Sequence, residues 1–233
     1  AGLGLRYEPM QLSAGPPSDP VQPQVMKQSV PIWAIPYTNP AQAPAAPRSP
    51  SDLGGDKVLP GGAPQDAENA KRLGTAVHRL LEVLPNAPQD QWGHIAQRLV
   101  EADIQAAAFQ EARAVLQQPQ LAYIFAPESL AEVDISAHLP ELNGDPIQGS
   151  IDRLLISPTR VLAVDFKSNQ IVPSEVAQVP SGLLRQMGAY AAALSQIYPH
   201  HDIETAILWT KTLELMPLPP DLVISSLANT SPA

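Results

Sequence analysis

Cysteine is missing altogether from the 233-residue sequence. Its absence excludes disulfides, thiolate zinc sites and iron–sulfur clusters, and it agrees with a cytosolic protein without requiring one. Long apolar runs are missing as well, since none approaches the roughly 18 residues that a membrane-spanning helix needs. No secretion signal is evident either, so we expect a cytoplasmic protein with no membrane partner.

Basic residues are scarce, with 14 Lys and Arg against 23 Asp and Glu and a formal net charge of −9. Non-specific affinity for nucleic acid comes chiefly from lysine and arginine side chains that neutralise phosphates. If the chain acts on DNA, we therefore expect this domain to have a weak intrinsic affinity for DNA. Either a local basic path near the site suffices or another polypeptide segment presents the strand, and we favour the second explanation.

Proline is plentiful instead, with 27 residues, and it is densest before residue 67. Proline-rich chains favour extended, solvated conformations and act as semi-rigid spacers. We predict a proline-rich, largely irregular linker over residues 1–66, a folded domain over residues 67–222 and a flexible tail over residues 223–233. An apolar patch within the linker, residues 31–36, is expected to dock on a neighbouring surface.

Hydrophobic periodicity predicts an α/β protein of the α+β type. A helix is expected over residues 68–84, ended by Pro85, and the turn Asn143-Gly144-Asp145 is expected to join the first two strands. The other expected elements are a helical region at 89–117 that could be two helices, a short piece at 120–125, strands at 130–139, 147–156 and 161–168, a helix at 182–197, and strands at 203–209 and 213–216. The order is helices, a three-stranded antiparallel meander, a helix and a strand.

Two aspartates lie on the hairpin formed by the second and third strands. An even-length turn pairs Ile156 with Val161, and the same register places Asp152 opposite Asp165. Directly opposed like charges lie about 4.5–5.5 Å apart at Cβ and destabilise a bare sheet. Exposed or hydrogen-bonded acid pairs also occur, but a bound divalent cation would remove the repulsion.

Lys167 follows the second of these aspartates by two residues. Because successive side chains of a strand point to opposite faces, Lys167 and Asp165 lie on the same face of the sheet. Their Cα atoms are about 6.6 Å apart at a rise of about 3.3 Å per residue. Cations such as Mg²⁺ usually combine one or two carboxylates with waters and substrate phosphate oxygens. The pattern therefore favours phosphodiester hydrolysis, although Lys167 could also be a surface lysine at a strand end.

Four motifs appear in the order used by the RecB-like nucleases of the PD-(D/E)XK superfamily, which the chain resembles over about residues 49–222. They are Gly74-Thr75-Ala76-Val77-His78-Arg79-Leu80-Leu81-Glu82, Gly149-Ser150-Ile151-Asp152-Arg153, Asp165-Phe166-Lys167-Ser168-Asn169 and Gln186-Met187-Gly188-Ala189-Tyr190. More narrowly, the chain resembles the C-terminal nuclease domain of AddA-type subunits of bacterial AddAB helicase-nucleases. Two further segments carry that narrower resemblance, Arg48-Ser49-Pro50-Ser51 and Ala206-Ile207-Leu208-Trp209-Thr210.

The resemblance implies a restriction-endonuclease-like core and roles for particular residues. The implied metal ligands are the side chains of His78, Asp152 and Asp165 and the backbone carbonyl of Phe166. The implied catalytic set is Lys167, Asp165, Asp152, Gln186 and Tyr190, the last two orienting the site and the DNA. Ser168 stands where threonine is common in the family, which is a small departure.

By the same resemblance we expect an Mg²⁺-dependent deoxyribonuclease, with Mn²⁺ as a substitute, that degrades single strands from an end in double-strand break repair and homologous recombination. The implied partners are DNA as a single strand or duplex end, an AddB-like subunit and a helicase portion of the same polypeptide. The sequence has no Gly-x-x-x-x-Gly-Lys-[Ser/Thr] phosphate loop, so ATP would be used outside it. We expect a C-terminal fragment of a longer, cytoplasmic and nucleoid-associated bacterial protein.

Two other functions agree with the same residues. The chain could be a free-standing RecB-like or Cas4-like exonuclease, or a noncatalytic nuclease-like scaffold that binds a partner subunit or a DNA end. Arg153 and Arg185 could contact phosphate or form structural ion pairs. The remaining histidines, His94, His138, His200 and His201, offer no further ligand set.

Some site residues also have structural interpretations. His78 taken alone could be a packed helical histidine, and Gln186 and Tyr190 could be ordinary helix packing. Glu132 is interpreted first as a solvated strand residue or salt-bridge partner, and second as an additional site acid or DNA-contacting acid.

Overall fold

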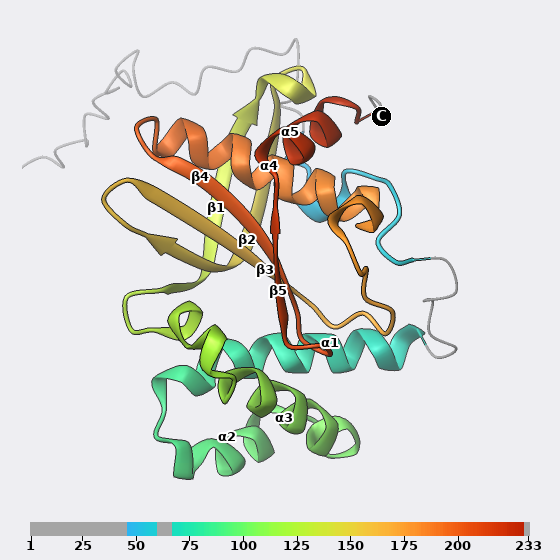
Figure 1. Cartoon of the computed structure of the whole chain (residues 1–233). Coiled ribbons are helices and arrows are strands. Elements are labelled where there is room, and N and C mark those ends of the chain that lie inside the picture. Colours follow the sequence, from blue (N-terminus) through green and yellow to red (C-terminus); the bar gives the residue numbers. More distant parts are fainter. Residues whose placement is uncertain (1–45, 60–66, 231–233) are drawn as a thin grey trace, which may run out of the picture. The chain divides into compact units, whose positions relative to one another are not determined.

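The structure, a computed structural model, describes residues 46–59 and 67–230 (Figure 1). The expected docking patch at residues 31–36 lies outside the described residues, as does most of the predicted linker. Among helices within the described ranges, none has the length and apolar character that crossing a bilayer requires.

A five-stranded mixed sheet forms the centre of the fold. The strands lie in chain order as β1 (Leu130–Leu139), β2 (Asp145–Ile156), β3 (Arg160–Lys167), β4 (Asp202–Trp209) and β5 (Glu214–Leu218). Neighbouring strands pair antiparallel except β3 and β4, which run parallel. A parallel pair needs a crossover connection, and α4 (Ser181–Ile197) supplies it. The predicted meander, helix and strand are thus confirmed.

Helices cover both faces of this sheet (Figure 1). One hydrophobic core lies between the sheet, α4 and α5 (Pro220–Ala228), and the other between the sheet and α1 (Ala67–Val83), α2 (Trp92–Leu99) and α3 (Ala102–Leu116). Successive residues of β3 alternate between these cores, with Val161 and Ala163 in the first and Leu162 and Val164 in the second. Because β3 is buried on both faces, any charged residue on it needs a partner inside the protein.

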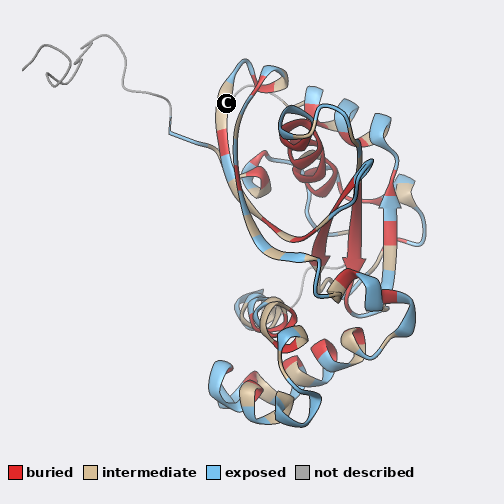
Figure 2. Ribbon diagram, turned by 90° about the vertical axis from the view of Figure 1, so that its left-hand side faces the viewer, coloured by how far each residue is buried: buried red, intermediate tan, exposed pale blue. Residues whose placement is uncertain are grey.

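The contact between α4 and α5 is unusually close. A Cβ atom at Gly188 of α4 would lie 2.3 Å from the carbonyl oxygen of Val223 on α5, and α4 is buried along most of its length (Figure 2). Val223 and Leu227, one helical turn apart, are both buried in this contact. The predicted flexible tail at residues 223–233 is therefore wrong for its described part, because these apolar side chains dock a helix that begins at Pro220.

The described end of the predicted linker is folded as well. Arg48 forms an isolated parallel bridge with Ile147, and a 3₁₀ turn follows at Pro50–Asp52. Leu53 is 2% exposed and belongs to the core beneath α4. Residues 46–59 are thus largely irregular in secondary structure, but one buried leucine and backbone pairing to β2 hold the segment on the domain.

Candidate active site

The hairpin of β2 and β3 has the predicted register. Ile156 pairs with Val161, and the ladder continues as far as Arg153 and Val164. The next pair in that register would be Asp152 and Asp165, but the ladder stops one residue short of it. There the carboxylate of Asp152 accepts a hydrogen bond from the backbone amide of Phe166 at 2.5 Å. The acidic side chain thus replaces a strand-to-strand bond and opens the sheet at this level.

Helix α1 brings a histidine to the opening. A Cβ atom at Gly74 would lie 2.8 Å from the hydroxyl oxygen of Ser168, so glycine lets α1 approach the end of β3 closely. One turn later, His78 Nδ1 lies 3.1 Å from Asp152 Oδ1, and its ring meets that of Phe166 edge-on at 5.6 Å between centroids. The predicted proximity of His78 to Asp152 is therefore present in the structure.

The pKa values of this pair move in opposite directions. Burial lowers the pKa of His78, but the hydrogen bond to Asp152 and the charges of Asp152 and Asp165 outweigh it, so the pKa lies above its usual value. Burial raises the pKa of Asp152, but His78, the Phe166 amide and the charge of Lys167 hold it below its usual value. Both shifts favour the charged form, which makes Asp152 an ionised carboxylate at the opening.

Asp165 has a separate set of partners on the buried strand. It is 4% exposed and forms an ion pair with Lys167, two residues along β3. Its Oδ1 accepts a hydrogen bond from Gln186 Nε2 on α4 at 2.6 Å. Burial and the charge of Asp152 raise the pKa of Asp165 by more than Lys167 lowers it. The pKa therefore lies above its usual value. Asp152 and Asp165 are thus electrostatically coupled although α1 binds one and α4 the other.

The two predicted polar residues of α4 form a chain behind Asp165. Gln186 Nε2 lies 3.2 Å from the hydroxyl oxygen of Tyr190, and that hydroxyl donates to the carbonyl of Ser150 at 2.6 Å. Both side chains are buried. Gln186 and Tyr190 therefore tie α4 to β2 and to Asp165, and burial raises the pKa of Tyr190, which keeps the hydroxyl protonated as a donor.

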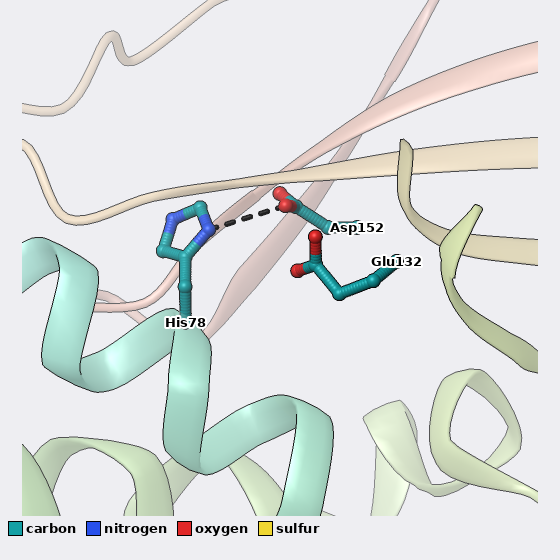
Figure 3. A group of neighbouring side chains, drawn as sticks. All are labelled: His78, Glu132 and Asp152. Carbon is teal, nitrogen blue, oxygen red and sulfur yellow. Dashed lines mark hydrogen bonds and ion pairs between the residues drawn. The ribbon is translucent and has the colours of Figure 1, made fainter. Parts of the chain in front are cut away.

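Glu132 lies on β1, next to Asp152 on β2 and on the side away from β3. One donor or acceptor atom from each of His78, Glu132 and Asp152 lies within 4.8 Å of the others, and Figure 3 shows the three side chains converging. Among described residues this is the sole grouping of this kind. The three line an open cleft of about 340 Å³ together with residues of α1, namely Gly74, Thr75, Arg79 and Glu82. Glu132 is exposed, as its first interpretation as a solvated strand residue expects, and it lies where its second interpretation as an additional site acid would place it.

These residues suit a hard divalent cation. Carboxylate oxygens with one imidazole nitrogen form a donor set that such ions accept. At a metal–ligand distance of about 2.1 Å, opposite ligands lie about 4.2 Å apart. The observed limit of 4.8 Å therefore requires only small side-chain adjustments.

The two arginines considered for phosphate contact, Arg153 and Arg185, form contacts within the protein. Arg153 is 2% exposed, donates to the carbonyl of Leu81 at 2.7 Å and lies 5.1 Å from the ring centroid of Phe125. Arg185 donates to the carbonyls of Leu53 and Asn229. Among the remaining histidines, the imidazole of His138 binds the carbonyl of Gly144 and the ring of His201 packs on that of Tyr198.

A second buried network anchors the end of β3 and was not predicted. The amide of Thr210 donates to the carbonyl of Lys167 at 3.0 Å, and the Thr210 hydroxyl donates to Glu111 Oε1 on α3 at 2.5 Å. The other oxygen of Glu111 lies 2.5 Å from Lys211 Nζ. Glu111 and Thr210 are 99 positions apart, so no local pattern could have paired them. This network holds the strand end that carries Lys167.

Comparison with known protein families identifies a domain in the chain. Residues 55–215 match the model of the PD-(D/E)XK nuclease superfamily. The match spans most of the chain and all of the residues that form the opening between β2 and β3. The chain therefore belongs to the PD-(D/E)XK nuclease superfamily. A search of curated proteins returned no match.

Proposed function

We propose that the protein is a divalent-metal-dependent deoxyribonuclease that hydrolyses phosphodiester bonds at the opening between β2 and β3. The observation that carries the proposal is the meeting of two pairs at this point, His78 with Asp152 and Lys167 with Asp165. Membership of the nuclease superfamily supports the reaction class.

In the proposed site the cation is held by the side chains of His78, Asp152 and Asp165 and by the carbonyl of Phe166. A bound Mg²⁺, or Mn²⁺ in its place, supplies polarisation of a phosphoryl oxygen and a lower pKa for a bound water. Metal binding by Asp152 suits its ionised state, because its pKa is held below the usual value.

Lys167 is the proposed catalytic cation. Its ammonium group lies at the Asp165 carboxylate, where it can neutralise charge that builds up on the phosphoryl oxygens in the transition state. Gln186 holds one oxygen of Asp165, and Tyr190 holds Gln186 against β2. These two residues therefore act as positioning groups for the carboxylate and, through it, for the lysine.

The finer proposal is that this nuclease works as the C-terminal part of an AddA-type helicase-nuclease, cutting single strands exonucleolytically in double-strand break repair. The motif order supports this narrower proposal. So does the net charge of −9, because a domain with so few basic residues needs other segments to hold DNA. An AddB-like subunit and a helicase portion would be its partners, with ATP used by the helicase and the assembly located in the bacterial cytoplasm at the nucleoid.

The test is cleavage of end-labelled single-stranded DNA with Mg²⁺, Mn²⁺ or EDTA. We expect cutting with either metal, none with EDTA, and a loss of at least about 100-fold in Lys167→Ala and Asp165→Asn. Lys57→Ala removes the same charge as Lys167→Ala from an exposed ion pair with Asp52 and should cut normally. Equal activity of Lys167→Ala and Lys57→Ala, both folded, would contradict the proposed site.

A further inference from the structure

Strand β1 changes its conformation at Glu132. The residues that follow, Val133, Ile135, Ala137 and Leu139, alternate regularly into the core beneath α4. Glu132 has a φ of 47°, in the left-handed region that few residues other than glycine adopt. A strained backbone at a position with no turn to make is a reason to look for a function of the side chain.

The register of β1 and β2 places this residue directly across from the candidate metal ligand. Ala131 pairs with Arg153 and Val133 with Ile151, so Glu132 and Asp152 are opposite each other. These two residues form no backbone bridge, although both flanking pairs do. The ladder between β1 and β2 is thus interrupted at the same level as the ladder between β2 and β3, on either side of Asp152.

The Glu132 carboxylate faces other acids in the cleft. Its Oε2 accepts a hydrogen bond from the Ser150 hydroxyl at 3.2 Å. Partial desolvation raises the pKa of Glu132, and the charges of Asp152 and Glu82 raise it further, while His78 lowers it. The nearest arginine along β2, Arg153, turns its guanidinium to Leu81 and Ser129 instead. Two opposed carboxylates destabilise a sheet, and the imidazole beside this pair, His78, is hydrogen-bonded to Asp152.

We propose that Glu132 is a further ligand of the divalent cation bound by His78 and Asp152, so that β1 contributes a carboxylate to the metal site. This inference rests on the proposed function, since it assumes that a cation binds at this opening. A ligand from β1 would place negative charge on the cleft side of the ion, while Asp165 and Lys167 lie toward α4.

The test measures binding of Mn²⁺ alone, without DNA, by isothermal titration calorimetry and electron paramagnetic resonance. We expect Glu132→Gln to weaken Mn²⁺ binding by about 10-fold or more, in the range seen when supporting groups of metal sites are removed. The matched control is Glu204→Gln, which neutralises an exposed acid of β4 that pairs with Arg160 at the opposite end of β3 from Lys167. It should change the affinity less than about twofold, because exposed charges act weakly at a distance.

A second variant separates binding from folding. Glycine adopts positive φ without steric cost, so Glu132→Gly should keep or raise the thermal midpoint of the metal-free protein. The same variant should lose most of the Mn²⁺-induced rise in that midpoint. A purely structural role for Glu132 predicts the reverse: a lower metal-free midpoint and an unchanged Mn²⁺-induced rise.

The outcomes distinguish this inference from the proposed function. If wild type binds Mn²⁺, Asp152→Asn does not, and Glu132→Gln binds as well as wild type, the inference about Glu132 is overturned and the metal site stands. If wild type itself binds no Mn²⁺, the proposed metal-dependent function fails and the inference fails with it.

Discussion

At the residue scale, Asp165 depends on a relay of hydrogen bonds that starts on β2. The carbonyl of Ser150 accepts from Tyr190, whose oxygen lies near the Gln186 amide that binds Asp165. The side chains of Tyr190, Gln186 and Asp165 are buried, so removal of one leaves its neighbour without a partner and without water. The relay therefore links the stability of the fold to the orientation of the carboxylate.

We predict that Tyr190→Phe destabilises the protein by about 1–3 kcal/mol, because the Ser150 carbonyl and Gln186 lose a partner. It should also lower kcat more than it raises KM, since the relay orients a reacting group rather than DNA. Urea unfolding and steady-state cleavage measure both effects. The control is Tyr123→Phe at a tyrosine that is 47% exposed, which should change stability by less than about 0.5 kcal/mol. Identical behaviour of the two variants would show that the relay has no such role.

The Thr210 hydroxyl gives a second prediction at the same scale. Thr210→Val keeps the shape but leaves an oxygen of the buried Glu111 without its donor, so we expect a loss of about 1–3 kcal/mol. Thr210→Ser retains the hydroxyl and should recover most of that loss. Chemical denaturation of the three proteins measures the difference, and equal losses in the valine and serine variants would exclude the hydrogen bond as the cause.

At the element scale, the close contact of α4 and α5 is the feature most sensitive to added volume. Gly188→Ala places a methyl group 2.3 Å from the Val223 carbonyl oxygen, so α5 must move and stability should fall by about 1–3 kcal/mol. Gly93→Ala in α2 meets nothing within 4 Å and should stabilise the protein by about 0.5–1 kcal/mol. Thermal unfolding of both variants tests this contrast, and a stable Gly188→Ala protein would mean that α5 is loosely attached after all.

The sequence predicted elements well where the periodic signal was long. The hairpin of β2 and β3 has the predicted pairing because its short turn leaves little choice of register. The pairing of β1 with β2 could not be read from the turn at Asn143 and Gly144, because the connection also contains a 3₁₀ turn at Pro140–Leu142. That turn sets which residue of β1 faces Asp152, so the sequence could suggest Glu132 as a site acid but not its position opposite Asp152.

Helix α5 and some long-range contacts could not be predicted for related reasons. Helix α5 has two buried residues, Val223 and Leu227, which is too few for a clear helical pattern after the prolines. Its existence depends on the surface of α4 around Gly188, and this surface exists only in the folded protein. Contacts of this kind, like that between Glu111 and Thr210, join segments far apart in sequence and carry no local signal.

At the scale of the whole molecule, charge limits how the protein holds DNA. The net charge is −9, Arg153 and Arg185 are engaged with the protein itself, and Arg79 in the cleft pairs with Glu82. We predict weak binding of single-stranded DNA, with log K falling by no more than about 2 per unit of log salt, since each neutralised phosphate contributes about 0.7. Fluorescence anisotropy over a salt series measures this slope. A slope steeper than about −4 would show that a basic path on the protein binds DNA, contrary to this prediction.

Diffraction from crystals grown with Mn²⁺ is the decisive measurement for the proposed metal site, because the anomalous signal locates the ion without reference to activity. We expect a peak at the opening between β2 and β3, in contact with His78 and Asp152. A well-ordered opening without a peak, at Mn²⁺ concentrations that support cleavage, would contradict a metal-dependent nuclease site at these residues.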